Sequence, residues 1–332
     1  MTVRVPGAPG PLAVGVDIGG SKVLAVAIDD TGEVVATHRL ASNGGAAGVV
    51  ESAVEAVERL AQHLGVPVSA LSVVGVGVPG LVQPSSGDVT HAVNLGVGPD
   101  TLSLGVRLAE RLGVAVVVEN DVNAAALGAA QVLRLGDTDL AFLSIGTGLA
   151  AGLVSGGRLR RGARGAAGEI GHIPVDPAGP LCSCGQRGCL ETLASGSAIA
   201  AAWPSADGLP PATALFAAAA AGDPSAVAVR DGFAEHVASA VRLLVLTCDA
   251  ETVVLGGGVT DLGTSLLDAI IAALRRQAAV SPFLAALELP ERVAIVPAGS
   301  AVAAIGAALV GIAARDSAAS TAWVDGVASR PA

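Results

Sequence analysis

The sequence predicts an α/β protein with two lobes, and three observations lead to this prediction. The chain has 332 residues, which is more than one hydrophobic core usually holds. Short runs rich in β-branched residues alternate with stretches of helical period. Residues 12–29 and 140–157 share one form, an apolar strand, a glycine-containing turn with a hydroxyl residue and a second apolar strand, which indicates an internal duplication with one hairpin per lobe.

The predicted strands are short and almost entirely apolar, as is typical of buried sheets. They cover Leu12–Val16, Val73–Val78, Val114–Val118, Leu140–Ile145 and Thr252–Leu255. Between some of these strands, the spacing of Ala, Leu and Glu residues predicts helices over Gly48–Leu64 and Asp121–Leu135.

The C-terminal part contains an uncharged run, Val293–Ala314, that is long enough to cross a bilayer. The run is mostly Ala and Gly, contains Pro297, and lacks the Leu, Ile and Phe content of a spanning helix. We therefore expect a strand at Arg292–Val296, a glycine turn, and a helix whose small side chains let it pack closely on a sheet. Residues 319–332 are rich in Ala and Ser and are expected to form a loose tail.

Composition narrows the possible partners and compartments. The 19 basic and 29 acidic side chains give a net charge of −10 without a basic patch, so a nucleic-acid partner is not expected. Four cysteines, and no charged-then-apolar leader in MTVRVPGAPG, favour the reducing cytoplasm over secretion. We expect a cytoplasmic protein with neither nucleic-acid nor membrane partners.

The turn of the first hairpin is a candidate phosphate site. Glycine has no Cβ, so backbone N–H groups at such a turn can approach an anion closely. The relevant residues are Asp17 at the strand end, then Gly19, Gly20, Ser21 and Lys22. An ordinary hairpin is the alternative explanation for these residues taken alone.

Two further glycine clusters have the same character. They are Gly146, Thr147 and Gly148 in the second hairpin, and Gly256, Gly257 and Gly258 between a predicted strand and a helical stretch. Two glycine-tipped hairpins in one chain make a nucleotide-phosphate role more plausible than either does alone.

Three of the four cysteines lie within the segment GPLCSCGQRGCLE. Cys182, Cys184 and Cys189, with His172 ten residues upstream, form a Cys3His set that is typical of a closed structural zinc site. A disulfide and buried apolar thiols are the weaker alternatives. Cys248 lies outside this segment, in an apolar stretch, and is predicted to be a core residue.

Several acidic residues are candidates for catalysis and for sugar binding. Asp121 follows a predicted strand and begins a helix, so it lies where α/β folds bind ligands, although a helix cap explains it equally well. A helical turn in GEIGH would place Glu169 and His172 on one face. Together with Glu191 they would suit the vicinal hydroxyls of a sugar, unless these carboxylates are simply solvated.

The motifs DIGGSK, VPG, VENDVNAAALG, SIGTG, GEIGH, CSCGQRGCLE and VLGGGV, in this order, resemble the ROK family (repressors, open reading frames and kinases) over about residues 12–315. Within the family the resemblance is to ATP-dependent glucokinases. It implies an actin/hexokinase-like (ribonuclease H-like) α/β fold of two lobes with an interlobe cleft. We expect the small lobe to contain residues 1–118 and about 300–318, and the large lobe residues 119–299.

The resemblance implies transfer of phosphate from ATP to the 6-hydroxyl of a hexose, by default glucose. It implies that Asp121 is the general base, that Asp17 is an outer-sphere partner of Mg²⁺, and that the glycine clusters bind the nucleotide. It also implies a structural Zn²⁺ on His172, Cys182, Cys184 and Cys189. The implied sugar-binding residues are Gly80, Asn94, Asn120, Asp121, Glu169, His172 and Glu191.

Three alternatives to a glucose kinase remain, and the oligomeric state is also open. The sugar could be an N-acylhexosamine such as N-acetylmannosamine or N-acetylglucosamine. A sugar-responsive repressor is disfavoured, because only 16 residues precede Asp17 and the chain is acidic. An inactive sugar-binding protein would require loss of Asp121 or of the phosphate loops. The resemblance also implies a homo-oligomer, either a dimer or a tetramer.

The sequence departs from the family pattern at a few positions. Ser21 stands where Thr is usual, which keeps the hydroxyl. The stretch NLGVGPD at Asn94 lacks the tryptophan that the family often has nearby, so the wall of the sugar pocket is not predicted. The cysteine segment is typically absent from relatives that use polyphosphate, so its presence favours ATP as the phosphate donor.

Overall fold

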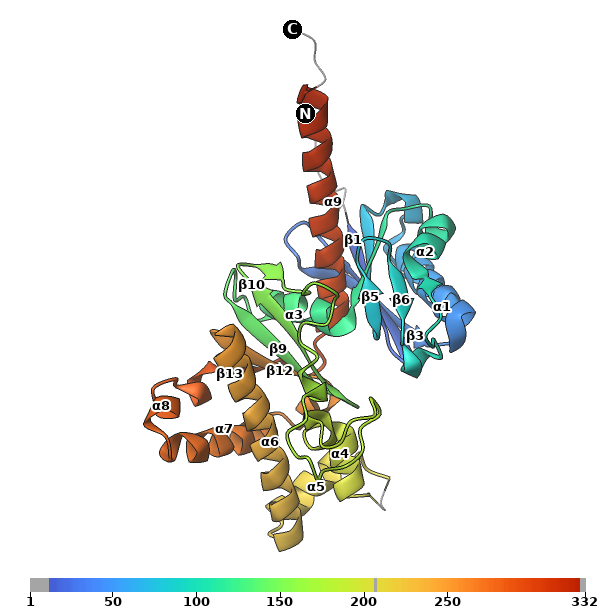
Figure 1. The fold of residues 1–332 in the computed structure, drawn as a ribbon. Helices are drawn as coiled ribbons and strands as arrows, with labels where there is room; N and C mark the ends of the chain where they lie inside the picture. Colours follow the sequence, from blue (N-terminus) through green and yellow to red (C-terminus); the bar gives the residue numbers. More distant parts are fainter. Residues whose placement is uncertain (1–11, 206–207, 329–332) are drawn as a thin grey trace. The chain divides into compact units, whose positions relative to one another are not determined.

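The computed structural model describes residues 12–205 and 208–328 and divides into two compact units (Figure 1). Unit 1 contains the chain up to Gln131 together with the residues from Ala301 onward, and unit 2 contains Val132–Ser300. The division therefore falls after Gln131 rather than after residue 118, so that Asn120 and Asp121 belong to unit 1.

Unit 1 is built on a five-stranded sheet in the order β3-β2-β1-β4-β8. The strands are β1 Ala13–Ile18, β2 Lys22–Ile28, β3 Val34–Ala41, β4 Val73–Val78 and β8 Val116–Asn120. Strand β1 is antiparallel to β2 and parallel to β4, and β4 is parallel to β8. The parallel strands β1, β4 and β8 therefore end at the same edge of the sheet, which brings Asp17 and Asn120 to that edge.

One face of this sheet is covered by helices α1 (Gly45–Leu64) and α2 (Leu104–Leu112). Their buried residues join Val14, Val16 and Ile18 of β1 in one hydrophobic core. The alternation along β1 sends Ala13, Gly15 and Asp17 to the opposite face.

The opposite face packs against helix α9 (Val302–Ala328), which runs beside β1 in Figure 1. A Cβ atom on Gly15 would lie 1.8 Å from the carbonyl oxygen of Ala304, and one on Gly75 would lie 1.8 Å from that of Ala307. Helix α3 (Asp121–Val132) contacts α9 in the same way, because a Cβ on Gly128 would lie 1.8 Å from the Val302 oxygen. The predicted close packing of a small-residue C-terminal helix on a sheet is confirmed.

The segment between β4 and β8 forms a small antiparallel sheet in the order β5-β6-β7, made of Leu81–Gln83, Asp88–Thr90 and Leu102–Ser103. It also contains the short 3₁₀ helix η2, Val93–Leu95. Another 3₁₀ helix, η1 Val68–Ala70, precedes β4.

Unit 2 repeats the five-stranded sheet in the order β11-β10-β9-β12-β13. The strands are β9 Leu140–Ile145, β10 Leu149–Ser155, β11 Arg158–Leu159, β12 Thr252–Gly256 and β13 Val293–Ile295. Each neighbouring pair runs in the same relative direction as its counterpart in unit 1. The predicted internal duplication is therefore confirmed and extends beyond the hairpins to the whole sheet.

Helices and short 3₁₀ turns complete unit 2. They are η3 Ile170–His172, η4 Leu190–Thr192, α4 Gly196–Ala202, α5 Pro211–Ala220, α6 Pro224–Cys248, η5 Gly258–Leu262, α7 Thr264–Ala279, α8 Pro282–Ala285 and η6 Leu289–Arg292. The core lies between the sheet, α5, α6 and α7, with Leu143, Val241 and Ile270 fully buried in it. Asp223 caps α6 by accepting hydrogen bonds from the backbone N–H groups of Ser225 and Ala226.

Two predictions about local structure differ from what is found. Cys248 is exposed rather than a core residue, because it is the last residue of α6, where the helix emerges from the core into solvent. Helix α9 continues to Ala328, whereas a loose tail was expected over residues 319–332; residues 329–332 lie outside the described part of the chain.

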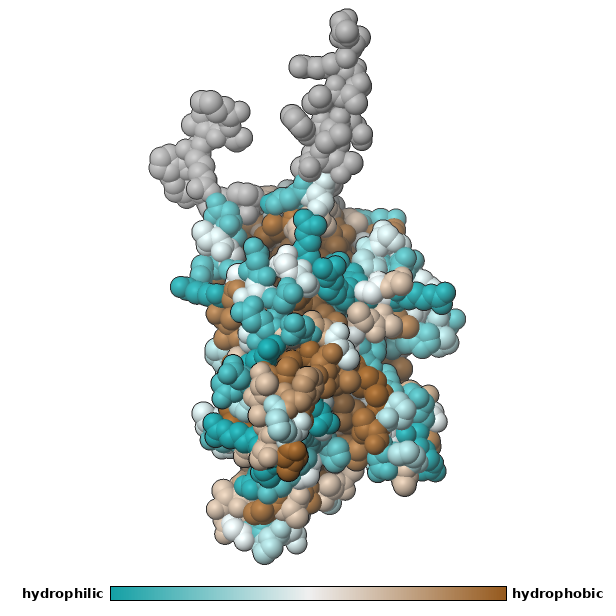
Figure 2. Space-filling view, turned by 60° about the vertical axis from the view of Figure 1, so that its left-hand side comes forward, coloured by the Kyte–Doolittle hydropathy of each residue, from teal (hydrophilic) through white to brown (hydrophobic). Residues whose placement is uncertain are grey.

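Among the described residues no single helix has the length and apolar composition needed to cross a bilayer, and only the bent pair of α5 and α6 meets these criteria jointly. Figure 2 shows hydrophobic side chains interspersed with hydrophilic ones on the face it displays. Large hydrophobic side chains that are exposed include Val93, Leu181, Val280 and Phe283.

Candidate functional site

The turn of the first hairpin lies against the short helix η2. The backbone N–H of Gly19 donates to the Lys22 oxygen at 2.9 Å, which closes the turn. A Cβ on Gly20 would lie 2.9 Å from the carbonyl oxygen of Asn94. The structure thus brings the predicted phosphate turn, with Ser21 and Lys22 following, next to the predicted sugar-side residue Asn94.

Asp17 is an acid in an unusual environment at the end of β1. Burial, reinforced by the carboxylate of Asp121, raises the pKa of Asp17 to about 7, and the charge of Lys22 opposes this rise. Two carboxylates that repel each other in one neighbourhood are a suitable oxygen donor set for a divalent cation, which would relieve the repulsion. The residues present therefore fit Mg²⁺ at this edge of the sheet.

Asn120 joins three segments at the carboxyl end of β8. Its Oδ1 accepts hydrogen bonds from the backbone N–H groups of Val122 at 3.0 Å and Asn123 at 3.1 Å, so that it caps α3. Its Nδ2 donates to the Gly80 oxygen at 3.1 Å. Gly80 has φ +98°, and a Cβ there would lie 2.6 Å from the Thr90 oxygen, so this position requires glycine.

Asp121 is the first residue of α3, and its Oδ1 accepts a hydrogen bond from the backbone N–H of Val122 at 2.9 Å. Because Asn120 bonds both Val122 and Asn123, the capping role belongs to Asn120. Helix capping therefore does not explain why an aspartate stands at position 121. A carboxylate at a strand's carboxyl end is available to accept a proton from a bound hydroxyl group.

Glu119 is a site residue that the sequence interpretation missed. It is only 1% exposed, and its Oε1 accepts hydrogen bonds from the Asn120 backbone N–H and from Asn123 Nδ2, both at 3.0 Å. This buried carboxylate fixes the backbone immediately before Asp121. Its sequence signal was a charged residue that continues an otherwise apolar strand.

The tip of the second hairpin, in unit 2, meets the third glycine cluster. The Gly146 N–H donates to the Gly148 oxygen at 3.1 Å, which closes the turn that contains Thr147. A Cβ on Gly257 would lie 2.6 Å from the Ile145 oxygen, where β9 ends. Gly256 packs against the ring of Phe142, and Gly258 begins η5. The two predicted nucleotide-binding clusters of unit 2 are thus adjacent.

The Cys3His set is assembled in unit 2. The candidate ligand atoms of His172, Cys182, Cys184 and Cys189 all lie within 4.8 Å of one another. Cys182 Sγ is 3.6 Å from His172 Nδ1, and Cys184 Sγ is 3.6 Å from Cys189 Sγ. Zinc–sulfur bonds of about 2.3 Å in a tetrahedron require sulfur atoms about 3.8 Å apart, so the spacing fits zinc.

The state of the thiols also fits a metal. All four cysteines are free, which excludes the disulfide alternative. A hydrogen bond from the Gln186 side chain is the largest of the causes that lower the pKa of Cys184 to about 6. Burial raises the pKa of Cys182 and raises that of Cys189 to about 12, so these two groups remain thiols without a metal. The thiolate is the form of cysteine that binds a metal, and metal binding would displace these thiol protons. The residues therefore fit the zinc that the sequence predicts.

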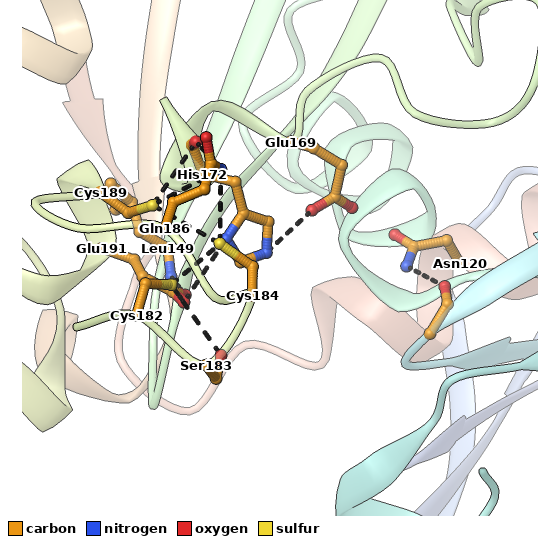
Figure 3. A network of polar contacts seen from close by, with 11 residues as sticks. Asn120, Leu149, Glu169, His172, Cys182, Ser183, Cys184, Gln186, Cys189 and Glu191 are labelled. Carbon is orange, nitrogen blue, oxygen red and sulfur yellow. Dashed lines mark hydrogen bonds and ion pairs between the residues drawn. The ribbon is translucent and has the colours of Figure 1, made fainter. Parts of the chain in front are cut away.

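The imidazole of His172 has two different neighbourhoods, which Figure 3 shows. Its Nδ1 faces the thiols, whereas its Nε2 lies 3.9 Å from Glu169 Oε2. Residues three apart in a 3₁₀ turn share a face, and Glu169 directly precedes η3, so the predicted pairing of Glu169 and His172 is confirmed. One ring can thus bind a metal through Nδ1 and still offer Nε2 to a substrate.

Glu191 lies between the cysteine set and the second hairpin. Its Oε1 is 3.2 Å from Cys182 Sγ and 3.7 Å from His172 Nδ1, and its Oε2 accepts a hydrogen bond from the Leu149 N–H at 3.4 Å. The sequence interpretation placed Glu191 on the sugar but did not anticipate its contact with the hairpin.

Each unit assembles its own set of predicted residues. Unit 1 contains Asp17, Gly19, Gly20, Ser21, Lys22, Gly80, Asn94, Asn120 and Asp121. Unit 2 contains Gly146, Thr147, Gly148, Glu169, His172, Cys182, Cys184, Cys189, Glu191, Gly256, Gly257 and Gly258.

Two relatives of known name are similar to this chain over most of its length. A glucokinase from Halalkalibacterium halodurans is 33% identical over 276 residues, which are 77% of this chain and 83% of that protein. An N-acetylmannosamine kinase from Citrobacter koseri is 32% identical over 250 residues, which are 74% of this chain and 82% of that protein.

The fold and the family are established by two further matches. A ROK family glucokinase from Streptomyces griseus, solved in complex with glucose and AMPPNP, is 34% identical with a TM-score of 0.74, and the match covers 90% of this chain and 99% of that one. The predicted actin/hexokinase-like α/β fold is therefore confirmed. The sequence model of the ROK family matches residues 13–313 of this chain. This chain belongs to the ROK family.

Proposed function

We propose that this protein is an ATP-dependent kinase that phosphorylates a hexose at the 6-hydroxyl, with glucose as the substrate and glucose 6-phosphate as the product. The observation that carries this proposal is the end of β8, where Asn120 caps α3 and the Asp121 carboxylate stands at the strand's carboxyl end, in the neighbourhood of Asp17. The relatives support the reaction class, since the kinase from Streptomyces griseus was solved with glucose and AMPPNP.

In the proposed mechanism Asp121 accepts the proton of the attacking hydroxyl, and Asn120 orients the sugar beside it. General-base catalysis of this kind contributes about 10²–10⁴-fold to the rate. Phosphoryl transfer otherwise depends mainly on alignment and on neutralising charge. The backbone N–H groups around Gly19, Gly146 and Gly257 would bind the phosphates, because the absence of side chains opens the backbone to an anion.

Magnesium would be held near Asp17 through its water ligands, and it would supply charge neutralisation on the phosphates. Asp17 would keep that hydration shell in place, and Lys22 would balance the negative charge at this edge of the sheet. Burial and the charge of Asp121 raise the pKa of Asp17, which means that they disfavour its ionised form. A nearby cation would counteract both effects and restore the carboxylate.

On the sugar side, we propose that Glu169 and the Nε2 atom of His172 bind sugar hydroxyls, with Gly80, Asn94 and Glu191 completing the set. A zinc ion on Nδ1 of the same imidazole would hold the ring in one orientation. A zinc ion held there would therefore have a structural role and would not act as a Lewis acid.

An N-acylhexosamine is the alternative substrate. The N-acetylmannosamine kinase from Citrobacter koseri is 32% identical to this chain, nearly as similar as the glucokinase. The motifs for hydroxyl binding do not distinguish the two sugar classes, because both present the same 3- and 4-hydroxyls and differ at C2, where the acylamino group replaces a hydroxyl. We further propose that the protein is a cytoplasmic homo-oligomer, a dimer or a tetramer, without nucleic-acid or membrane partners.

Measuring ADP release tests the proposal. The zinc-loaded protein is mixed with Mg-ATP and, separately, with glucose, mannose, fructose, allose, N-acetylglucosamine and N-acetylmannosamine at equal concentration. Glucose is expected to give the highest kcat/KM. A preference for an acetylated sugar would keep the mechanism and replace the substrate, whereas no release with any sugar would overturn the kinase proposal.

A further inference from the structure

We propose that Glu191 is a positioning residue that couples the Cys3His set to the tip of the second hairpin, so that metal binding strengthens the binding of the nucleotide. The inference rests on the proposed function in one respect, namely that the hairpin tip Gly146–Gly148 binds nucleotide phosphate. It adds a role for the metal on the phosphate-donor side, beyond the orientation of His172.

The first step of the argument is the position of the Glu191 carboxylate. One oxygen accepts a hydrogen bond from the Cys182 thiol at 3.2 Å, and the other accepts a hydrogen bond from the Leu149 N–H at 3.4 Å. A metal on Cys182 would displace the thiol proton and so change the first of these two contacts. The side chain is only 19% exposed. As Figure 3 shows, a single carboxylate spans the distance from the cysteine set to the first residue of β10.

The second step concerns Gly148 at the hairpin tip. A Cβ atom at this position would lie 2.7 Å from Glu191 Oε2. Glu191 is therefore packed directly on the backbone of the tip, and any movement of its carboxylate changes what the Gly148 and Leu149 backbone contacts. The Glu191 carboxylate could also accept hydrogen bonds from the backbone N–H groups of the tip, where it would compete with phosphate. Its position must therefore be fixed.

The third step is the other side of the same turn. Five residues after Glu191, the Gly196 N–H donates to the Gly146 oxygen at 2.7 Å. The segment 191–196 therefore contacts both ends of the tip. Since Cys189 lies two residues before Glu191, a metal bound by Cys189 would anchor this segment where it begins.

The fourth step is the GEIGH segment, which precedes the cysteines and contacts β10. The Ala151 N–H donates to the Gly168 oxygen at 2.8 Å. A Cβ on Gly171 would lie 2.0 Å from the Leu149 oxygen, so the backbones touch. His172 follows directly, and a metal on its Nδ1 would tie this contact to the one made by Glu191.

The inference follows from these contacts together. Two segments that contain metal ligands hold the second hairpin, one through β10 and one through the tip. Without the metal, the loop that carries three of the four ligands loses its cross-link, and the contacts at Leu149 and Gly146 lose their fixed positions. The nucleotide must then order the hairpin tip when it binds, and the free energy that this ordering costs lowers the nucleotide affinity.

Calorimetric titration of Mg-AMPPNP, without sugar, tests the coupling. It is carried out on zinc-loaded protein and on protein stripped by a chelator, with circular dichroism to verify that both are folded. Stripping is expected to weaken nucleotide binding at least fivefold, the lower end of typical coupling between sites. In Glu191→Ala the nucleotide affinity is expected to be lower and no longer to respond to zinc.

The matched control is Glu291→Ala, which removes an exposed carboxylate from η6 in the same unit. Its response to zinc is expected to equal that of the wild type. Glu191→Gln, which keeps the shape and one acceptor oxygen, is expected to restore part of the response. Equal nucleotide affinity in zinc-loaded and stripped wild type would overturn the coupling and leave the kinase proposal intact.

A second measurement does not depend on any variant. Coupling is reciprocal, so Mg-AMPPNP must tighten zinc binding by the same factor. Competition with a chromogenic zinc chelator, with and without Mg-AMPPNP, measures this factor on wild-type protein. An unchanged zinc affinity would contradict the inference. If zinc-loaded protein binds no AMPPNP, the phosphate role of the hairpin fails, and the coupling fails with it.

Discussion

The five-stranded sheets of unit 1 and unit 2 have the same strand order and directions but different side chains at matching positions. When the two hairpin turns are aligned, Gly15 corresponds to Phe142 and Asp17 to Ser144. Gly15 admits the backbone of α9, whereas the Phe142 ring packs against Gly256. The two units thus share one sheet architecture, but this face is covered by a close-packed helix in unit 1 and carries an aromatic side chain in unit 2.

The inserted segments differ more than the sheets do. Unit 1 inserts β5 to β7 and η2 before β8, and this segment supplies Gly80 and Asn94. Unit 2 inserts GEIGH and the cysteine segment between β11 and β12, and these supply His172 and Glu191. The turns that we propose to bind phosphate belong to the repeated part. In the proposed function, the duplication would provide phosphate binding, while the inserted segments would supply the metal ligands and most of the sugar-binding residues.

The largest effect is expected from Asp121→Asn, which removes the proposed proton acceptor at the end of β8, a position without a counterpart at the end of β13. Turnover is expected to fall about 10²–10⁴-fold, with sugar affinity changed only a few-fold. Steady-state kinetics and sugar titration measure the two quantities. Asp268→Asn, on the exposed side of α7, is the control and should keep normal turnover. Near-normal turnover of Asp121→Asn would remove the base from the mechanism.

Gly15→Ala tests the contact that only unit 1 makes with α9. The added Cβ would lie 1.8 Å from a backbone oxygen, so the strand or the helix must shift. The free energy of unfolding is expected to fall by about 3 kcal/mol or more, at the upper end for overpacked sites. Urea denaturation measures it. Gly98→Ala, where a Cβ meets no atom within 4 Å, should not be destabilised; equal stabilities of the two variants would contradict this packing.

Glu119→Ala is expected to reduce kcat about tenfold, because it leaves the Asn120 N–H and the Asn123 amide without their shared acceptor. Glu119→Gln retains an acceptor oxygen and is expected to recover most of kcat. The sugar KM is expected to change less than kcat in both variants. Kinetics per folded molecule, with folding measured separately, distinguish positioning from simple loss of stability. Equal kcat in the Ala and Gln variants would mean that the hydrogen bonds do not matter.

The last comparison contrasts Asp17 with Ser144 as a function of pH. The pKa of Asp17 is raised from 3.8 to about 7 in the folded state, so the native protein binds a proton that the unfolded chain releases near pH 4. This contribution to stability is present below pH 4 and is lost as the pH rises through about 7. Asp17→Asn is therefore expected to gain stability over the wild type at pH 8 but not at pH 4.5. Denaturation at both pH values measures this.

Ser144→Ala is the matched variant, because Ser144 occupies the same position in the second hairpin without a titrating group. Its stability relative to the wild type should not change between the two pH values. A wild-type and an Asp17→Asn protein with parallel pH dependences would show that Asp17 ionises normally. Because Asp17 is also the proposed partner of Mg²⁺, the more stable Asn variant is expected to be the less active one.

Much of the fold could be predicted because its signals are local. Val73–Val78 and Leu140–Ile145 form strands with the predicted bounds, since continuous apolar runs between turn residues leave few other options. The hairpin turns and the Cys3His set were likewise readable from glycine and cysteine spacing.

Other features depend on contacts between distant segments, which local patterns do not encode. In the sequence Glu119 is only a charged residue at the end of a strand, and its hydrogen bond with the side chain of Asn123 on the following helix is not apparent. The contact of Glu191 with Leu149 joins residues 42 positions apart. Cys248 has apolar neighbours in sequence, but the helix carries it out of the core. The contacts of Glu119 and Glu191 and the exposure of Cys248 could therefore be found only from the packed structure.

Helix α9 has a consequence for the order of events during synthesis. Strands β1 and β4 are made before unit 2, whereas α9, the helix that lies on Gly15 and Gly75, is made after it. Unit 2, by contrast, is one continuous stretch and can complete its core first. Unit 1 is therefore begun before unit 2 but finished after it, and the uncovered face of its sheet needs protection from unwanted association until α9 has been made.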